Sequence, residues 1–239
     1  MKLIEKGLVP HSYKINIFGI RIRFRNKFEM KNNKVIIVSK NGKESVKTPK
    51  GLKVKFLGEN SLVKIYSPCP KFKNCQITCY DNAFVSIGSS NREISNLTVN
   101  IFSKNGKLIL GNNLKIRGGG IFIGDKENLS VSIGDNCLFA KTISIRTADY
   151  HVVVDKDTKQ PLNEPASVNI GNHCWLCDEA VICKGVSLAD DTIVGARSYV
   201  TKSFDKTNTI IAGIPARVVK DANTTWSEMS YEQYLASIS

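Results

Sequence analysis

The sequence has 239 residues, of which 42% are hydrophobic and 23% charged, so it can bury a core without disulfides or metals to hold it together. No stretch approaches the roughly 18 apolar residues of a membrane span, and the first residues lack the apolar core and cleavage site of a signal peptide. A cytoplasmic location is therefore expected, and peripheral membrane association stays open.

The net charge of +13 is concentrated near the N-terminus. Residues 1–55 contain 15 Lys and Arg against three acidic residues. This excess is either a solvated basic face or a surface for an anionic partner, such as an acidic glycan or a phospholipid surface. No recognised nucleic-acid-binding motif accompanies the charge, so nucleic acid is not expected as a partner.

In chain order, residues 1–50 contain alternating stretches beginning at Lys14 and Arg21 that read as β-strands with one basic face. Residues 51–132 consist of short strand-like runs separated by Gly, Asn and Ser. The spacing of these runs varies, which indicates imperfect coils of a β-helix with small insertions.

A strict repeat follows. Between residues 170 and 200 an aliphatic residue stands at every sixth position, and a small or β-branched residue stands four positions after each of the first five. A period of six fits neither an α-helix nor an ordinary strand, but it is typical of a parallel β-helix with three hexads in each coil. Residues 18 apart should then stack about 4.8 Å apart. The aliphatic series is Ile170, Leu176, Ile182, Leu188, Val194 and Val200, and the small series is Cys174, Ala180, Val186, Thr192 and Ser198.

The same register runs through Ile133, Phe139 and Ile145, and His151 takes the next sixfold position. The polar, proline-containing segment of about 152–167 reads as an excursion loop from the wall. We therefore expect a basic β segment over residues 1–50, a β-helix over 51–222 and a helical tail over 223–239. The tail is expected to cap the open end of the β-helix.

Seven cysteines are an odd number for a disulfide framework. Cys174 and Cys177 form a C-x-x-C pair, but the repeat assigns Cys174 to the inward side of the wall and Cys177 to a turn. We therefore interpret them as wall residues rather than a redox or metal pair, and no metal is expected. A metal-dependent β-helix enzyme needs three suitably spaced histidines, which His11, His151 and His173 do not provide.

His151 is the strongest candidate for chemistry because it lies where a regular wall gives way to a loop. A neutral imidazole is the natural general base near neutral pH. Asp149 could orient that imidazole, although a backbone carbonyl could do so equally well. His173 falls at a turn position and is expected to be simply exposed. Trp175 should face outward and therefore needs a covering subunit, loop or ligand.

Four runs of sequence resemble the C-terminal signature of the hexapeptide-repeat acyltransferases. They are IGNHCWLC from Ile170, VICKGV from Val181, IVGARSYVTK from Ile193 and AGIPARVV from Ala212. The sequence is most similar to the group that holds the maltose, galactoside, xenobiotic and sialic-acid or capsule O-acetyltransferases. Asp149-Tyr-His151, with Trp175 24 positions later, is similar to that group's histidine-to-tryptophan arrangement.

This resemblance implies an all-β fold, a left-handed parallel β-helix assembled as a homotrimer, with acetyl-CoA in the groove between subunits. His151 would be the catalytic base, assisted by Asp149 and Trp175, and backbone N–H groups would stabilise the oxyanion. Trp175 would pack against the pantetheine arm or the acceptor. The family usually has Trp-Ile-Gly where this sequence has Trp175-Leu-Cys177, so a thiol stands beside the groove. The other implied contacts are Gly195 and Ala196 along the wall, and Thr201, Lys202, Arg217 and Lys220 at the phosphates.

The sequence therefore predicts an acetyl-CoA-dependent O-acetyltransferase of a bacterial surface or capsular polysaccharide. The basic N-terminal segment favours an acidic acceptor. The first 105 residues do not match the short helical acceptor domain of the maltose-type enzymes, which argues against a simple sugar as substrate. Two alternatives stay open: an antibiotic or small-sugar acetyltransferase, and a non-catalytic β-helical scaffold or binding protein.

Overall fold

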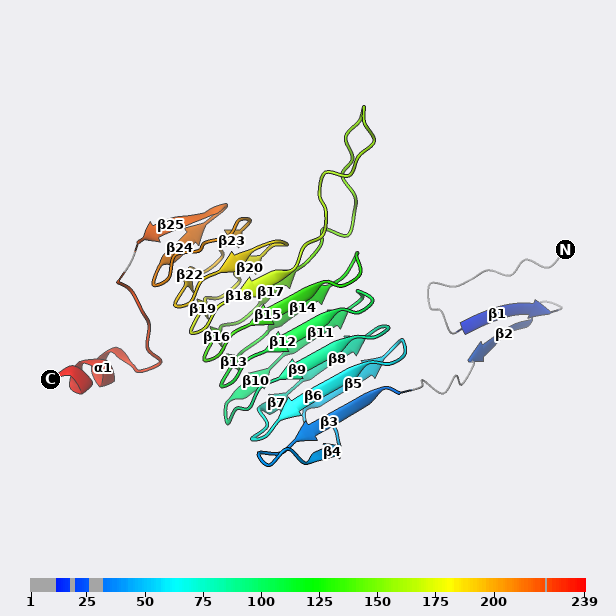
Figure 1. The fold of residues 1–239 in the computed structure, drawn as a ribbon, viewed down its shortest axis with the longest axis horizontal. Coiled ribbons are helices and arrows are strands. Elements are labelled where there is room, and N and C mark those ends of the chain that lie inside the picture. The colour runs from blue at the N-terminus through cyan, green and yellow to red at the C-terminus, as the bar shows by residue number, and fades with distance from the viewer. Residues whose placement is uncertain (1–11, 18–19, 26–31, 222) are drawn as a thin grey trace.

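The computed structural model describes residues 12–17, 20–25, 32–221 and 223–239. Most of them form three sheets, here called sheets I, II and III, that enclose one hydrophobic core as the faces of a prism (Figure 1). Within the β-helix each coil gives one strand to each sheet in turn, so that neighbouring strands of a sheet come from successive coils and run parallel.

The strands are bounded as follows. Sheet I contains β7 (Lys71–Lys73), β10 (Glu93–Ser95), β13 (Lys115–Ile116), β16 (Leu138–Phe139), β19 (Trp175–Leu176), β22 (Ile193–Val194), β24 (Ile210–Gly213) and β25 (Ala216–Lys220). Sheet II contains β5 (Leu52–Phe56), β8 (Cys75–Cys79), β11 (Leu97–Ile101), β14 (Gly119–Ile123), β17 (Ile143–Arg146), β20 (Val181–Ile182) and β23 (Tyr199–Val200). Sheet III contains β3 (Lys34–Val38), β4 (Glu44–Val46), β6 (Leu62–Tyr66), β9 (Phe84–Ile87), β12 (Lys107–Leu110), β15 (Ser130–Ile133), β18 (Val168–Ile170) and β21 (Ser187–Leu188).

The C-terminal coils follow the sixfold repeat. Ile170 pairs with Leu188 and Ile182 with Val200, so that each rung lies three hexads further along the chain than the rung it pairs with. All six aliphatic residues and all five small residues of the repeat are buried. The predicted stacking of residues three hexads apart is therefore confirmed.

The N-terminal coils are longer than the C-terminal ones and differ slightly in length, as expected of coils with small insertions. Val63 pairs with Val85, and Val85 with Leu108, so that each of these coils is longer than three hexads. The additional residues lengthen many strands of sheets II and III to four or five residues. The parallel ladder begins at β3, which pairs with β6 and lies within the segment assigned to residues 1–50.

Asparagine ladders fix several corners of these longer coils. The Asn82 side-chain amide donates to the Asn105 side chain at 3.0 Å, and Asn105 donates in turn to Asn128 at 2.9 Å. The three residues have φ values of 55°, 58° and 62°, a left-handed conformation that asparagine tolerates better than most residues. The frequent asparagines between the runs are therefore corner residues.

Near the N-terminus, β1 (Ser12–Ile17) and β2 (Ile20–Arg25) pair as an antiparallel hairpin. The predicted basic face of this segment concerns side chains that lie outside the described residues.

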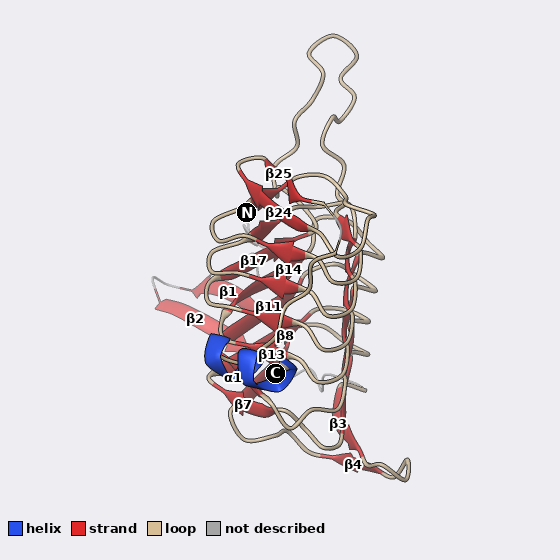
Figure 2. Cartoon of the chain, turned by 90° about the vertical axis from the view of Figure 1, so that its left-hand side faces the viewer, coloured by secondary structure: helices blue, strands red, loops and turns tan. Residues whose placement is uncertain are grey.

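At the other end of the chain, α1 (Tyr231–Ile238) begins at Ser230, which forms a capping box with Gln233. The prediction that this tail caps the β-helix is wrong: no residue of α1 is buried, and the chain before it runs back alongside sheet I (Figures 1 and 2). The final coil ends instead in the antiparallel β24–β25 hairpin.

No helix in the described part of the chain is long and apolar enough to span a membrane.

Candidate active site

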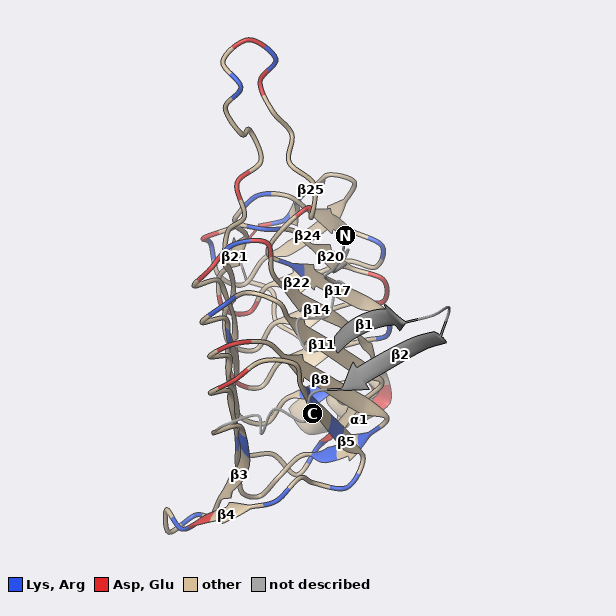
Figure 3. Ribbon diagram, turned by 90° about the vertical axis from the view of Figure 1, so that its right-hand side faces the viewer, with Lys and Arg blue, Asp and Glu red and all other residues tan. Residues whose placement is uncertain are grey.

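A loop projects from the wall beyond β17, the strand of sheet II that ends at Arg146 (Figure 1). His151 lies five residues after that strand, near the start of the loop. The loop leaves the wall after Thr147 and returns at Ala166, whose N–H donates to the Thr147 carbonyl at 2.9 Å. Its two limbs pair through the Leu162 N–H and the Val153 carbonyl at 2.7 Å, and its tip carries both acidic and basic residues (Figure 3). His151 is exposed, as are the residues on either side of it. The loop therefore presents an accessible imidazole beside a rigid wall.

Asp149 has partners other than the imidazole of His151. Its Oδ2 accepts a hydrogen bond from Asn163 Nδ2 at 2.8 Å and forms an ion pair with Lys184 Nζ. These two donors, Lys184 first, lower the pKa of the Asp149 carboxyl below its usual value. Asp149 is thus an ionised carboxylate that ties the loop to the corner after β20.

Asn163 is a site residue that the sequence analysis missed. Its Nδ2 also donates to the His151 carbonyl at 2.9 Å, and its Oδ1 accepts from the Val153 N–H at 2.7 Å. Lys184 Nζ donates to the Asn163 carbonyl at 2.8 Å. We call Asp149, Asn163 and Lys184 the loop latch, because together they join both limbs of the loop to the wall and fix the backbone at His151. An asparagine in a polar loop has no spacing signal by which the sequence could have revealed this role.

Two predicted cofactor contacts lie at the same corner as the His151 loop. Thr201 and Lys202 directly follow β23, which continues the ladder of sheet II two rungs beyond β17. Both are exposed, and Lys202 Nζ lies 5.6 Å from the ring centroid of Phe204.

The remaining predicted contacts lie along sheet I. Trp175 begins β19, and Cys177 follows that strand at the corner leading to sheet II. Arg217 and Lys220 are exposed residues of β25 at the end of sheet I. Within one chain the candidates therefore form two groups: the His151 loop, Thr201 and Lys202 beside sheet II, and the remaining candidates along sheet I.

The corner after β19 shows how the small residues are used. Cys177 is half-buried, and burial raises the pKa of its thiol, which keeps it protonated and weakly nucleophilic. A Cβ on Gly195 would lie 2.8 Å from the Cβ of Ala212 in the next coil, so that coil itself requires the glycine. Ala196 beside it is exposed.

Cys174 is fully buried in the wall, and all seven cysteines are free thiols. The described residues contain no group of three or more His, Cys, Asp or Glu side chains placed to hold a metal ion.

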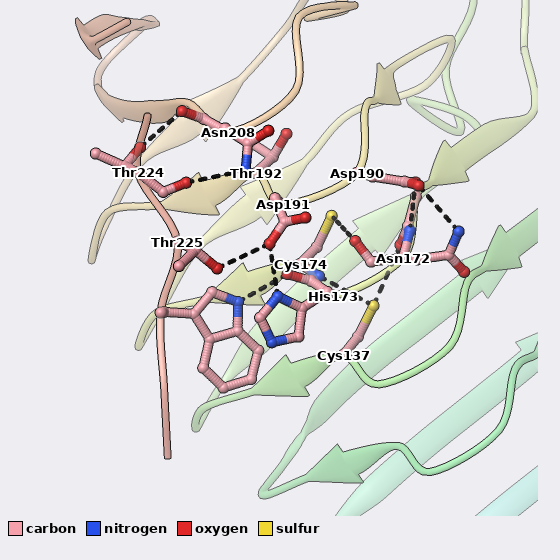
Figure 4. Close-up of polar contacts among 12 residues, drawn as sticks. Cys137, Asn172, His173, Cys174, Asp190, Asp191, Thr192, Asn208, Thr224 and Thr225 are labelled. Atoms are coloured by element: carbon pink, nitrogen blue, oxygen red, sulfur yellow. Dashed lines mark hydrogen bonds and ion pairs between the residues drawn. The ribbon is translucent and has the colours of Figure 1, made fainter. Parts of the chain in front are cut away.

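Trp175 is partly covered by the chain's own tail. The ring centroids of Trp175 and Trp226 lie 5.9 Å apart, and Trp226 stacks on His173 at 4.5 Å with an interplanar angle of 9°. The expectation that His173 is simply exposed is wrong, because its Nδ1 also lies 2.6 Å from Asp191 Oδ1, which accepts from Thr225 as well (Figure 4). The His173 ring therefore supports the tail.

No family model matches this sequence. The chain is 31% identical over 108 residues to the galactoside O-acetyltransferase of Escherichia coli K12, a match that covers 45% of this chain and 52% of that protein. It is 29% identical over 127 residues to a polysialic acid O-acetyltransferase of E. coli O1:K1, covering 53% of this chain and 40% of the relative. Both of these relatives are named O-acetyltransferases. The chain spans only about half of the length of these two.

In fold, the chain is similar to the crystal structure of the polySia-specific acetyltransferase NeuO, with a TM-score of 0.66 and 24% identity over 87% of this chain and 95% of that one. The predicted left-handed parallel β-helix of the hexapeptide-repeat type is thereby confirmed.

Proposed function

We propose that this chain is a cytoplasmic, acetyl-CoA-dependent O-acetyltransferase that modifies a hydroxyl group of an acidic surface or capsular polysaccharide. The observation that carries the proposal is an exposed histidine on a latched loop of the β-helix, in a chain similar to O-acetyltransferases. Acetyl-CoA supplies the acetyl group as a thioester.

His151 acts as the general base. Within the described residues its imidazole makes no hydrogen bond, so both ring nitrogens are open to an acceptor, while Asn163 holds its carbonyl. His151 takes the proton of the acceptor hydroxyl as that oxygen bonds to the acetyl carbon, and the proton then goes to the departing thiolate. Asp149 contributes by holding the loop through the latch rather than by contacting the ring.

The residues assigned to the phosphates of acetyl-CoA are suited to bind a polyanion. Lys202, Arg217 and Lys220 are exposed, and none of them forms an ion pair with a carboxylate in the described part of the chain. Fixed cations of this kind bind phosphate groups through charge-assisted hydrogen bonds. Thr201 adds a hydroxyl beside Lys202. Cys177, Gly195 and Ala196 form the wall along which the pantetheine arm lies.

The complete site requires two copies of the chain. Within one chain Trp175 lies on sheet I and His151 on the loop that follows sheet II, so the two residues belong to different sides of the prism. We therefore place the site between neighbouring copies of a homotrimer, with the His151 loop from one copy and the Trp175 wall from the next.

The acidic acceptor is inferred from charge. The excess of Lys and Arg over residues 1–55 would attract a polyanionic glycan and would do so less at high ionic strength.

The test measures thiol release from acetyl-CoA with a panel of acidic and neutral glycans, at low and high salt. We expect His151→Ala to abolish transfer while the trimer mass and CoA binding persist, and Gln160→Ala, on the same loop, to leave transfer intact. Transfer that persists in His151→Ala eliminates the catalytic assignment. If neutral sugars are better acceptors than every acidic glycan and salt has no effect, the small-sugar alternative is correct instead.

A further inference from the structure

The segment between the last hairpin and α1 follows one corner of the β-helix in reverse. We call residues 223–230 the C-terminal strap. Thr224 Oγ1 donates to the Asn208 carbonyl at 2.7 Å, and Trp226 Nε1 donates to the His173 carbonyl at 2.7 Å. Between them, Thr225 contacts the intermediate coil. The strap thus descends along the corner between sheets III and I, contacting successive coils.

Further down this corner the strap places a carboxylate between two cations. Glu228 Oε2 lies 3.1 Å from Lys115 Nζ, and Oε1 forms an ion pair with Arg92. The side chains of Glu228, Arg92 and Lys115 are 25%, 27% and 32% exposed, so all three are partly removed from water. Burial opposes ionisation of Glu228, yet the two cations lower the pKa of its carboxyl on balance. The corner therefore binds a carboxylate.

A hollow of about 410 Å³ adjoins this ion pair, within the size range of small-ligand sites. Its lining contains three cations and one carboxylate, together with hydroxyl and amide groups that can bind sugar hydroxyls. The lining residues are Glu93, Ser95, Asn96, Lys115, Ile116, Arg117 and Lys141. The hollow is therefore positively charged and polar, and Lys115 belongs both to it and to the Glu228 ion pair.

We propose that Arg92 and Lys115, with this hollow, form a subsite that binds the carboxylate of an acidic sugar, and that Glu228 of the strap occupies the subsite until such a ligand displaces it. The proposal rests on the proposed function, since it assigns the position of an acidic acceptor. Releasing Glu228 breaks two ion pairs between partly exposed side chains, and α1 beyond it contributes no buried residue that would oppose the movement. Trp226 lies two residues before Glu228 in the same strap, so a displacement that extends to Trp226 would break its hydrogen bond and stacking with His173 and uncover Trp175, the tryptophan assigned to the active site.

The chain contains two tryptophans. Trp226 belongs to the strap and Trp175 lies on the wall beside it, with ring centroids 5.9 Å apart, so intrinsic fluorescence reports the position of the strap. The experiment titrates the full-length protein with an oligosaccharide of carboxylated sugars, with the same oligosaccharide after methyl esterification, and with inorganic phosphate. Glu228→Gln removes the competing carboxylate. Glu127→Gln is the matched control, because Glu127 pairs with Lys104 at 3.8 Å, away from the strap, and loses the same charge.

We expect the carboxylated oligosaccharide to shift the fluorescence of the unmodified protein and the methyl ester not to do so. Glu228→Gln should bind the carboxylated ligand about three- to tenfold more tightly, the range expected for removing one or two partly exposed ion pairs. Adding Arg92→Gln should abolish that gain. Equal binding of the ester, or equal affinity of Glu228→Gln and Glu127→Gln, overturns the proposal. A response to phosphate as strong as that to the carboxylated ligand would show a general anion site and also overturn it.

Thiol release from acetyl-CoA, measured in the same variants, separates the two proposals. If transfer depends on His151 while Glu228→Gln has no effect on glycan binding, the subsite is wrong and the proposed function stands. If carboxylate binding follows Glu228 and Arg92 as described but no variant transfers acetyl, the subsite stands and the proposed function fails.

Discussion

The loop latch gives the sharpest test of how the fold positions His151. The substitution Asn163→Ala removes three hydrogen bonds: those from Nδ2 to Asp149 and to the His151 carbonyl, at 2.8 and 2.9 Å, and that from the Val153 N–H to Oδ1, at 2.7 Å. It leaves the buried core of the β-helix untouched. We therefore expect a local effect on the loop and none on global stability.

The magnitude follows from the exposure of these bonds. A net hydrogen bond contributes about 0.5–1.5 kcal/mol, and exposed bonds lie at the low end, so three of them stabilise the closed loop by about 1.5 kcal/mol. That free energy corresponds to about a tenfold change in the ratio of open to closed loop. The ion pair between Lys184 and Asp149 persists and keeps the loop from opening fully.

Hydrogen exchange of the amides in residues 152–162 measures this change directly. Asn163→Ala should raise their exchange rates about tenfold and lower the rate of acetyl transfer by up to the same factor, with an unchanged melting temperature. Gln160→Ala is the matched control, because the Gln160 side chain makes no hydrogen bond within the described residues. If both variants exchange and turn over alike, Asn163 does not hold the loop and the latch is refuted.

Three further outcomes follow from the structure. Leu176→Ala leaves a cavity at a fully buried position and should lower the free energy of unfolding by about 2–5 kcal/mol, measured by denaturant titration. A loss below about 1 kcal/mol would contradict the placement of Leu176 in the core. Asn105→Ala breaks two ladder bonds at a φ of 58° and should lower the melting temperature more than Asn105→Gly, which tolerates that φ; the reverse order would contradict the corner assignment. Lys184 and Asn163 lower the pKa of Asp149, so the latch is fully formed above the unfolded pKa of about 3.9 and is lost as the pH falls through the lower folded value. Exchange of the loop amides, corrected for the intrinsic pH dependence, should therefore accelerate only in that acidic range, and by a smaller factor in Lys184→Met, where only the Asn163 hydrogen bond to Asp149 remains.

The fold of the second half was predictable because its spacing leaves little choice. When each coil consists of three hexads, an aliphatic series at every sixth position fixes which side chains point inward and which rungs stack. Ile170 opposite Leu188 is a direct consequence. In the first half the coils are longer than three hexads and differ in length, so Val63, Val85 and Leu108 follow no short period. The first half also consists of stacked coils, but only the pairing of its strands in the structure shows this, because the sequence spacing does not.

The site was less predictable because its contacts join segments far apart in the sequence. Spacing singled out His151 and Trp175 and suggested that Asp149 orients the His151 imidazole. In the structure the partners of the Asp149 carboxylate are Asn163 and Lys184 instead. The tail was misplaced for a related reason. Its amphipathic pattern predicts a helix, but the position of that helix depends on contacts of Trp226 and Glu228 with coils that lie much earlier in the sequence.

The change in coil length and the position of the loop have one physical origin. In sheet II, β14 has five residues and β17 four, whereas β20 has two. Arg146 at the end of β17 pairs with Phe122 below it, but the ladder to β20 already ends at Ile145 and Ile182. The wide coils therefore end in a step beside Arg146, and the chain leaves the wall immediately after that step to form the loop. His151 stands there because a loop at a step in the wall can be held on one side by the wide coil and on the other by Lys184 of the narrow one. The register break that marked His151 in the sequence is thus the same event that creates a supported, open position for it.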